Sequence, residues 1–91
     1  MQRVTSGTTI NIAATAAVSK ASGTLLGYYV NNKTIGATLV LTHGSTAGGA
    51  AITGTVTPLI GYHEMNAYCP SGAYATIAVQ PMDITFFFAA G

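Results

Sequence analysis

Two carboxylates make up the whole acidic inventory of the 91-residue chain, and they are the first residues that could do chemistry. A two-carboxylate hydrolytic mechanism would need Glu64 and Asp83 side by side. Glu64 lies within an alternating stretch, and Asp83 precedes a run of apolar residues. We therefore expect an ordinary solvent-facing carboxylate at Glu64 and one that opens the last strand at Asp83.

Metal or thiol chemistry would have to come from His43, His63 and Cys69, with Glu64 as a fourth ligand. Paired cysteines or histidines a few residues apart, the usual ligand spacings, do not occur among them. His63 and Glu64 are adjacent, so in a strand they point to opposite faces. A thiol–imidazole pair of Cys69 with either histidine is equally weakly supported. We expect structural or surface histidines, a buried apolar Cys69, no metal, no cofactor and no enzymatic activity.

Two short motifs have a functional alternative. The stretch HGSTAGG, residues 43–49, has the glycines and hydroxyls of a phosphate-binding loop. It lacks the Gly-Lys-Ser/Thr ending and the following helix that such loops need, so we predict a hairpin loop. Residues 32–34, Asn-Lys-Thr, form a glycosylation triplet, for which a turn is the simpler prediction.

Charge is scarce: 5% of the residues are charged, against about 25% in ordinary globular domains. The formal net charge is +1, and the charged residues are Arg3, Lys20, Lys33, Glu64 and Asp83. Nucleic-acid binding needs clustered Lys and Arg, and a membrane span needs about 20 continuous apolar residues. Neither partner is expected. So little charge suits a surface that neighbouring subunits cover, in an oligomer or a larger assembly.

The N-terminal part has an alternative interpretation as a targeting segment. Arg3, the apolar run INIAATAAV and the small residues SKASG imitate a signal peptide. Lys20 follows the apolar run, which argues against it. A single cysteine, Cys69, excludes an internal disulfide, and this favours production in a reducing cytoplasm.

Strands must position all of these residues. Fourteen Thr, together with Val, Ile, Tyr and Phe, favour a pleated surface, and the frequent Gly disfavours long helices. Alternation and turn signals predict seven or eight short strands, at residues 8–15, 24–31, 36–43, 51–58, 61–69, 73–79 and 83–89. The prediction is a single all-β domain over residues 1–91, a compact antiparallel β-sandwich, with jelly-roll and immunoglobulin-like topologies both open.

Alternation also predicts which side chains face inward. In 51–58 we expect Ile52, Gly54 and Val56 inward and the three Thr outward. In 61–69, one face should carry Tyr62, Glu64, Asn66 and Tyr68.

Phe87 is the bulky residue expected to leave the inner face, and two explanations are open for it. It belongs to a second packed layer, or it anchors an interface, where aromatic residues are enriched. Residues 1–7 have a similar pair of explanations, an arm lying on a neighbour or an ordinary edge strand. The candidate interface residues are Met1, Gln2, Arg3, Val4, Thr5 and Phe87.

The runs GTLLGYYVNNKTIGATLVLTHG, ITGTVTPLIGYHEM, CPSGAYATIA and MDITFFF resemble small all-β structural proteins of tailed bacteriophages. The shared cadence is a Gly-Tyr-containing strand, a T-P-x-I-G corner, an S-G-x-Y-A-T-I hairpin and a final D-I-T-F strand, and it extends from Gly23 to Phe88. The resemblance implies a virion component of the capsid decoration (cement) type, made in the host cytoplasm and located on the capsid surface. Its implied partners are the major capsid protein, other virion subunits and further copies of itself, in a dimer or trimer.

We therefore expect a structural virion protein that binds the outside of the shell in many copies and bridges capsomers. The alternative is a carbohydrate- or receptor-binding module of a phage fibre or tail. In that case the face with Tyr62, Glu64, Asn66 and Tyr68 would supply aromatic platforms and polar groups for a sugar.

Overall fold

The computed structural model describes residues 8–90, which form seven strands and no helix. The predicted all-β class is confirmed. The strands are β1 (Thr8–Ile12), β2 (Ala16–Ser19), β3 (Gly23–Lys33), β4 (Thr38–His43), β5 (Gly61–Cys69), β6 (Ala73–Ala78) and β7 (Met82–Ala90).

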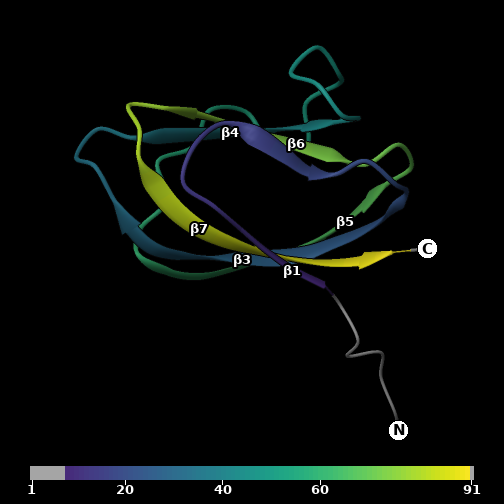
Figure 1. Cartoon of the computed structure of the whole chain (residues 1–91), viewed down its shortest axis with the longest axis horizontal. Helices are drawn as coiled ribbons and strands as arrows, with labels where there is room; N and C mark the ends of the chain where they lie inside the picture. The colour runs from purple at the N-terminus through teal and green to yellow at the C-terminus, as the bar shows by residue number, and fades with distance from the viewer. Residues whose placement is uncertain (1–7, 91) are drawn as a thin grey trace, which may run out of the picture.

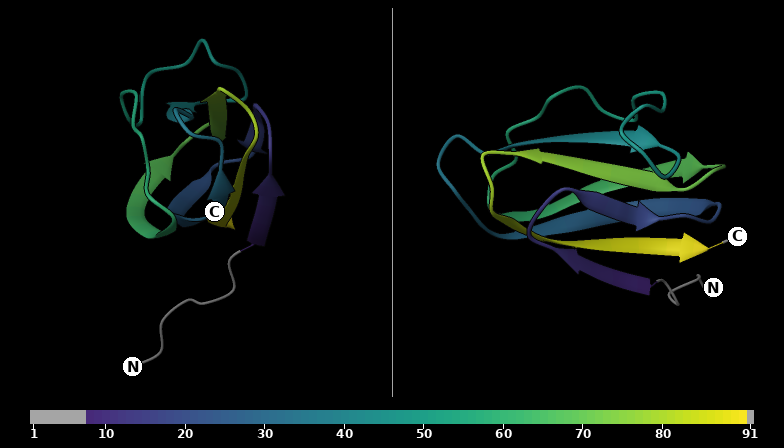
Figure 2. Two further views of the ribbon diagram at one scale, coloured as in Figure 1. Left: turned by 90° about the vertical axis from the view of Figure 1, so that its left-hand side faces the viewer. Right: turned by 45° about the horizontal axis from the view of Figure 1, so that its top comes forward.

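The strands pack as two antiparallel sheets, one above the other (Figure 1). Sheet A has the order β1-β7-β3-β5, and sheet B has the order β2-β6-β4. Among these seven strands, each connection passes from one sheet to the other, and Figure 2 shows the two sheets from two further sides. The predicted β-sandwich is therefore confirmed.

Residues 51–56 run beside β4 and take the place of an eighth strand. Antiparallel bridges join Leu39 to Val56 and Thr42 to Ala51. With this segment, sheet B becomes β2-β6-β4-(51–56), and the pair of four-membered sheets has the strand order of a jelly roll. Here only β4 and 51–56 are consecutive strands of one sheet, whereas the immunoglobulin sheets ABED and CFG keep three consecutive pairs together, A–B, D–E and F–G. The topology that the sequence left open is thus a jelly roll.

The strand predicted at 51–58 is wrong in detail, because the Thr53 side chain takes the place of part of the backbone hydrogen-bond ladder with β4. Thr53 Oγ1 accepts a hydrogen bond from Leu41 N at 3.1 Å, so Thr53 faces β4 rather than solvent. Leu41 O in turn accepts from the backbone of Ile52 at 2.7 Å and of Thr53 at 3.1 Å. Gly54 is exposed instead of inward, while Ile52 and Val56 pack against the core as predicted.

β2 was not predicted as a separate strand, because Ala16 and Ala17 have low strand propensity. It pairs with β6. Thr15, the residue just before β2, bonds to the backbone of β6 through its side chain. Thr15 Oγ1 accepts from Ile77 N at 2.9 Å and lies 3.3 Å from Ile77 O, to which it donates. The hydroxyl therefore extends the β2–β6 ladder by one residue.

The core lies between the sheets and depends on the inner row of β7. Met82, Ile84, Phe86 and Phe88 alternate inward with almost no exposed surface. The facing layer and the central strand β3 complete the core with Leu39, Leu41, Ile77, Leu25, Tyr28 and Val30. β3 lies between β5 and β7, which fits the evenly apolar pattern predicted for a central strand.

We expect Thr53→Val to lower the free energy of unfolding by about 1–2 kcal/mol, because the buried Leu41 N–H would lose its acceptor. Urea denaturation followed by circular dichroism measures this change. Thr55→Val, at an exposed neighbouring position, is the matched control and should shift stability by less than about 0.5 kcal/mol. Equal effects at the two positions would contradict the role given to the Thr53 hydroxyl.

Candidate contact surface

The two carboxylates lie far apart on the outer side of sheet A. Glu64 on β5 stands opposite Gly27, and Asp83 on β7 stands opposite Asn32. Two strand spacings of about 4.8 Å and five residues of about 3.3 Å separate these positions, well over about 15 Å in total. A two-carboxylate mechanism needs at most about 9.5 Å, so the two do not form such a pair.

Each carboxylate instead accepts a hydrogen bond from an amide side chain. Asn11 Nδ2 donates to Asp83 Oδ1 at 2.7 Å, and Asn66 Nδ2 donates to Glu64 Oε2 at 2.9 Å. Asn11 also donates to Thr85 Oγ1 at 3.1 Å, which ties β1 to β7 across their outer side. Both carboxylates therefore have structural partners within sheet A.

His63 and Cys69 face the interior side of β5. The His63 ring stacks on Tyr28 with centroids 5.0 Å apart, and His63 Nε2 lies 2.7 Å from Leu59 O. Cys69 is fully buried, and desolvation raises the pKa of its thiol, partly offset by a hydrogen bond from the Leu25 backbone. Burial also raises the pKa of the Tyr28 hydroxyl. Cys69 and Tyr28 belong to the core, and His63 lies partly exposed beside them.

His43 ends β4 on the other sheet, and its Nδ1 is buried without a hydrogen-bond partner among the described residues. His43 and His63 thus occupy different sheets. Between residues 8 and 90, no three side chains of His, Cys, Asp or Glu lie together as a metal site.

An aromatic face covers the outer side of sheet A, and we define it as Tyr29, Tyr62, Tyr68 and Phe87. The tyrosines are the exposed members, with Tyr68 reaching 61% exposure. The Tyr62 ring crosses β3 above Gly27, where any Cβ would clash with it, and stands 5.9 Å from the Phe87 ring. Phe87 does leave the inner face, as alternation predicts, but Tyr62 lies against it and it is only partly exposed.

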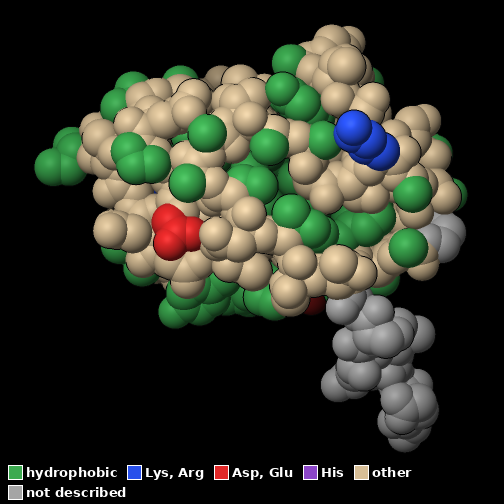
Figure 3. All heavy atoms as spheres, in the orientation of Figure 1, with side chains coloured by type: hydrophobic (Ala, Val, Ile, Leu, Met, Phe, Trp, Pro, Cys, Tyr) green, Lys and Arg blue, Asp and Glu red, His purple; other side chains and the backbone are tan. Residues whose placement is uncertain are grey.

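A second surface gathers aliphatic side chains at one end of the sandwich. We call it the apolar end and define it as Ile35, Leu59, Ile60 and Val79. Ile35 is 95% exposed and Leu59 is 73% exposed. Figure 3 shows hydrophobic side chains projecting at the left, where the β3–β4 and β6–β7 loops lie in Figure 1.

Strand pairing explains why these separate segments meet. Lys33 at the end of β3 pairs with Met82 at the start of β7, and Val30 pairs with Gly61 at the start of β5. The β3–β4 and β6–β7 loops are joined directly, because Thr34 donates to Pro81 O through both its backbone N–H, at 3.1 Å, and its hydroxyl, at 3.0 Å. Thr8 and Ala90, the first and last described residues, lie toward the opposite end of sheet A.

The sequence did not predict the apolar end, because its members lie in turns, where no alternation of a strand marks them. The one local signal is an aliphatic residue between turn formers, as in the stretches TIG at 34–36 and PLIG at 58–61. The convergence of the loops comes from strand order, which no local pattern encodes.

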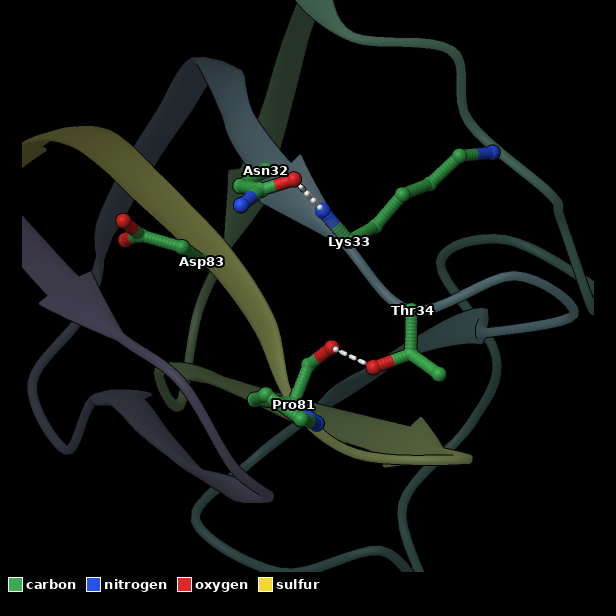
Figure 4. A pocket seen from close by; sticks show the side chains of 5 residues that line it. All are labelled: Asn32, Lys33, Thr34, Pro81 and Asp83. Atoms are coloured by element: carbon green, nitrogen blue, oxygen red, sulfur yellow. Dashed lines mark hydrogen bonds between the residues drawn. The ribbon is translucent and has the colours of Figure 1, made fainter.

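A shallow pocket of about 160 Å³ opens beside the apolar end. Figure 4 shows its lining, and the residues are Asn32, Lys33, Thr34, Pro81 and Asp83. The Lys33 ammonium points away from the Asp83 carboxylate, so the two do not converge on a common point (Figure 4). We assign no ligand to it.

The remaining interface candidates, Met1 to Thr5, lie outside the described residues. Within residues 8–90, no helix has the length and apolar character needed to cross a bilayer.

We expect the free energy of unfolding to fall in alkali. Folding raises the pKa of Cys69 and Tyr28, so their stabilising effect is complete below the unfolded values, about 8.5 and 10, and is lost as pH rises through the folded ones. Chemical denaturation at pH 7, 9 and 10.5 measures this. The double variant Cys69→Ala, Tyr28→Phe should show a flatter pH profile from a lower starting stability. A parallel decline in both proteins would contradict the assignment.

Comparison with known proteins gives no match: no protein-family model, no curated protein and no solved structure is significantly similar to this chain.

Proposed function

We propose that this protein is a structural subunit of a bacteriophage particle, a decoration protein that binds the outside of the capsid shell in many copies. The observation that carries the proposal is the apolar end, where strand pairing brings four exposed aliphatic side chains to one end of a molecule with very few charges. Exposed aliphatic clusters on a folded domain mark contact sites. The partner in this proposal is the major capsid protein or another virion subunit.

The apolar end is the more costly of the two surfaces to leave in water. Ile35 and Leu59 carry no polar atom in their side chains, so their exposed surfaces make no hydrogen bonds with water. The tyrosines of the aromatic face keep a hydroxyl that water satisfies. Near the apolar end, the charged side chains of the pocket are Lys33 and Asp83, so a partner that contacts the aliphatic side chains would have few charges to desolvate.

Bridging would act through many weak contacts. Fully burying one Ile or Leu side chain contributes about 1.5–3 kcal/mol, and part of this is lost to the entropy of association. A single contact is therefore weak, but a subunit that touches two neighbours gains through effective concentration. This is how a small protein with a thin core would stabilise a large shell.

The jelly roll is compatible with the proposal without selecting it. This architecture occurs in viral capsid proteins and in lectins, and a fold alone does not fix a function. The choice of a particle component comes from the apolar end, from the scarcity of charge and from the resemblance of residues 23–88 to phage structural proteins.

The test adds purified protein to capsids that lack it and measures bound copies and the temperature at which the shells rupture. We expect saturable binding and a higher rupture temperature. Ile35→Asp and Leu59→Asp should each weaken binding at least about tenfold, about 1.4 kcal/mol, and leave the melting temperature of the isolated protein nearly unchanged. Ser45→Asp, which adds the same charge to the exposed loop after β4, is the matched control and should bind normally. Absence of binding by the wild-type protein would overturn the proposal.

The aromatic face supports a second candidate, binding of a carbohydrate by a fibre or tail module. Tyr62 and Tyr68 are each more than half exposed, and the hydrogen bond from Asn66 to Glu64 fixes polar groups on the same strand between them. A glycan array should then give a signal that the double variant Tyr62→Ala, Tyr68→Ala loses, while Ile35→Asp keeps it. A silent array with the wild-type protein removes this candidate.

A further inference from the structure

A sheet edge presents unpaired backbone N–H and C=O groups, and a sandwich must protect each of its edges from other chains. Sheet A ends in β1 and β5, and sheet B ends in β2 and the segment 51–56. These four edges differ in how well they are protected.

Three of the edges carry features that block pairing. β5 has a bulge where its register with β3 shifts, with Asn66 at φ 56°, and it displays the charged Glu64. β2 is only four residues long and has its own register shift after Ala17. The segment 51–56 makes isolated bridges in place of a continuous ladder. Bulges, charges and short length are the usual protections of an edge.

β1 is also short, with five residues, but it carries neither a bulge nor a charge. Its five residues, Thr8 to Ile12, pair with β7 without a register shift, and none of them is charged or proline. Ile10 and Ile12 pack against the core but stay partly exposed at this side of the sandwich. A strand laid beside β1 would cover both isoleucines and pair the free backbone groups.

We propose that the occupant of this edge is a second copy of the chain, joined through an antiparallel β1–β1 pairing about a two-fold axis at Ile10. The two copies of sheet A then form one eight-stranded sheet. Ile10 stands opposite Ile10 of the partner subunit, and Thr9 stands opposite Asn11 of the partner subunit. In an isologous contact each residue i meets a residue j of the other copy and j meets i, so the strand must be compatible with its own reversed copy. β1 meets this condition because it offers only apolar and uncharged polar side chains.

Charge permits a second copy, and the small area makes the contact weak. A formal net charge of +1 makes repulsion between copies small. Two five-residue strands bury less than the roughly 1,200 Å² of a stable interface, so the dimer is a weak one in solution. Such a pair is populated at high local concentration, as on a shell that binds many copies. The pairing goes beyond the proposed function and does not depend on it.

The first test is sedimentation velocity over a concentration series. We expect a monomer–dimer equilibrium, and Thr9→Lys should weaken it at least tenfold, since the two new ammonium groups lie diagonally across the pair. High salt should restore part of the loss, because the repulsion is screened. Thr55→Lys, which adds the same charge at an exposed position beyond the other sheet, should dimerise normally.

The second test fixes the register. Residues opposite each other have Cβ atoms about 4.5–5.5 Å apart, close to the distance a disulfide spans. Ile10→Cys should therefore give a covalent dimer when oxidised glutathione takes up the two thiol hydrogens. Tyr68→Cys, exposed on the opposite edge strand, is the control and should stay monomeric. Native Cys69 is fully buried, so the background reaction should be small.

A wild-type chain that stays monomeric at millimolar concentration overturns the inference, and so does a folded Ile10→Cys variant that crosslinks no faster than Tyr68→Cys. Shell binding is measured separately. Binding without dimers refutes the β1 pairing and leaves the proposed function standing, whereas dimers without shell binding do the reverse.

Discussion

The packing of the inner row of β7 against sheet B is the interaction on which the rest of the structure depends. Met82, Ile84, Phe86 and Phe88 are buried in alternation, and β1 and β3 flank the strand on both sides. A domain of this size buries only about 60–65% of its unfolded surface, so a thin core must be completed at its margins. Threonine hydroxyls do this: Thr15 continues the ladder to Ile77, and Thr53 satisfies the backbone of Leu41.

The hydrogen bonds of these threonines change how the high threonine content is interpreted. Outward Thr and Ser could let a neighbour approach without desolvating charge, because a hydroxyl is readily matched by a hydrogen bond. Several hydroxyls are instead used within the fold, including Thr34, which joins two loops, and Thr42, which donates to Thr46 O at 3.2 Å. The surfaces left for contact are apolar and aromatic. Scarcity of charge and an exposed aliphatic cluster are then two aspects of one surface chemistry.

Alternation predicted β5 and β7 well, because each has one face against the core and a period of two follows directly from the pleat. It failed at 51–58, where the Thr53 side chain replaces backbone pairing, and at β2, where alanines carry too little hydrophobic contrast. It predicted that Phe87 leaves the inner face but not that Tyr62 lies against it, since that contact crosses β3 above Gly27. The apolar end could not be predicted at all, because it exists only once the strand order brings three loops together.

The two proposed contacts use different parts of the molecule, and the symmetry of one constrains the other. Strands run along the sandwich, with the apolar end at one extremity and β1 along the side (Figure 2). Antiparallel pairing of β1 about a two-fold axis reverses the strand direction of the second copy, so the two apolar ends of the dimer point in opposite directions. Such a dimer could not stand upright with both apolar ends on one flat surface. It would lie along the shell with each end against a different neighbour, and that is the geometry a subunit needs to bridge two capsomers.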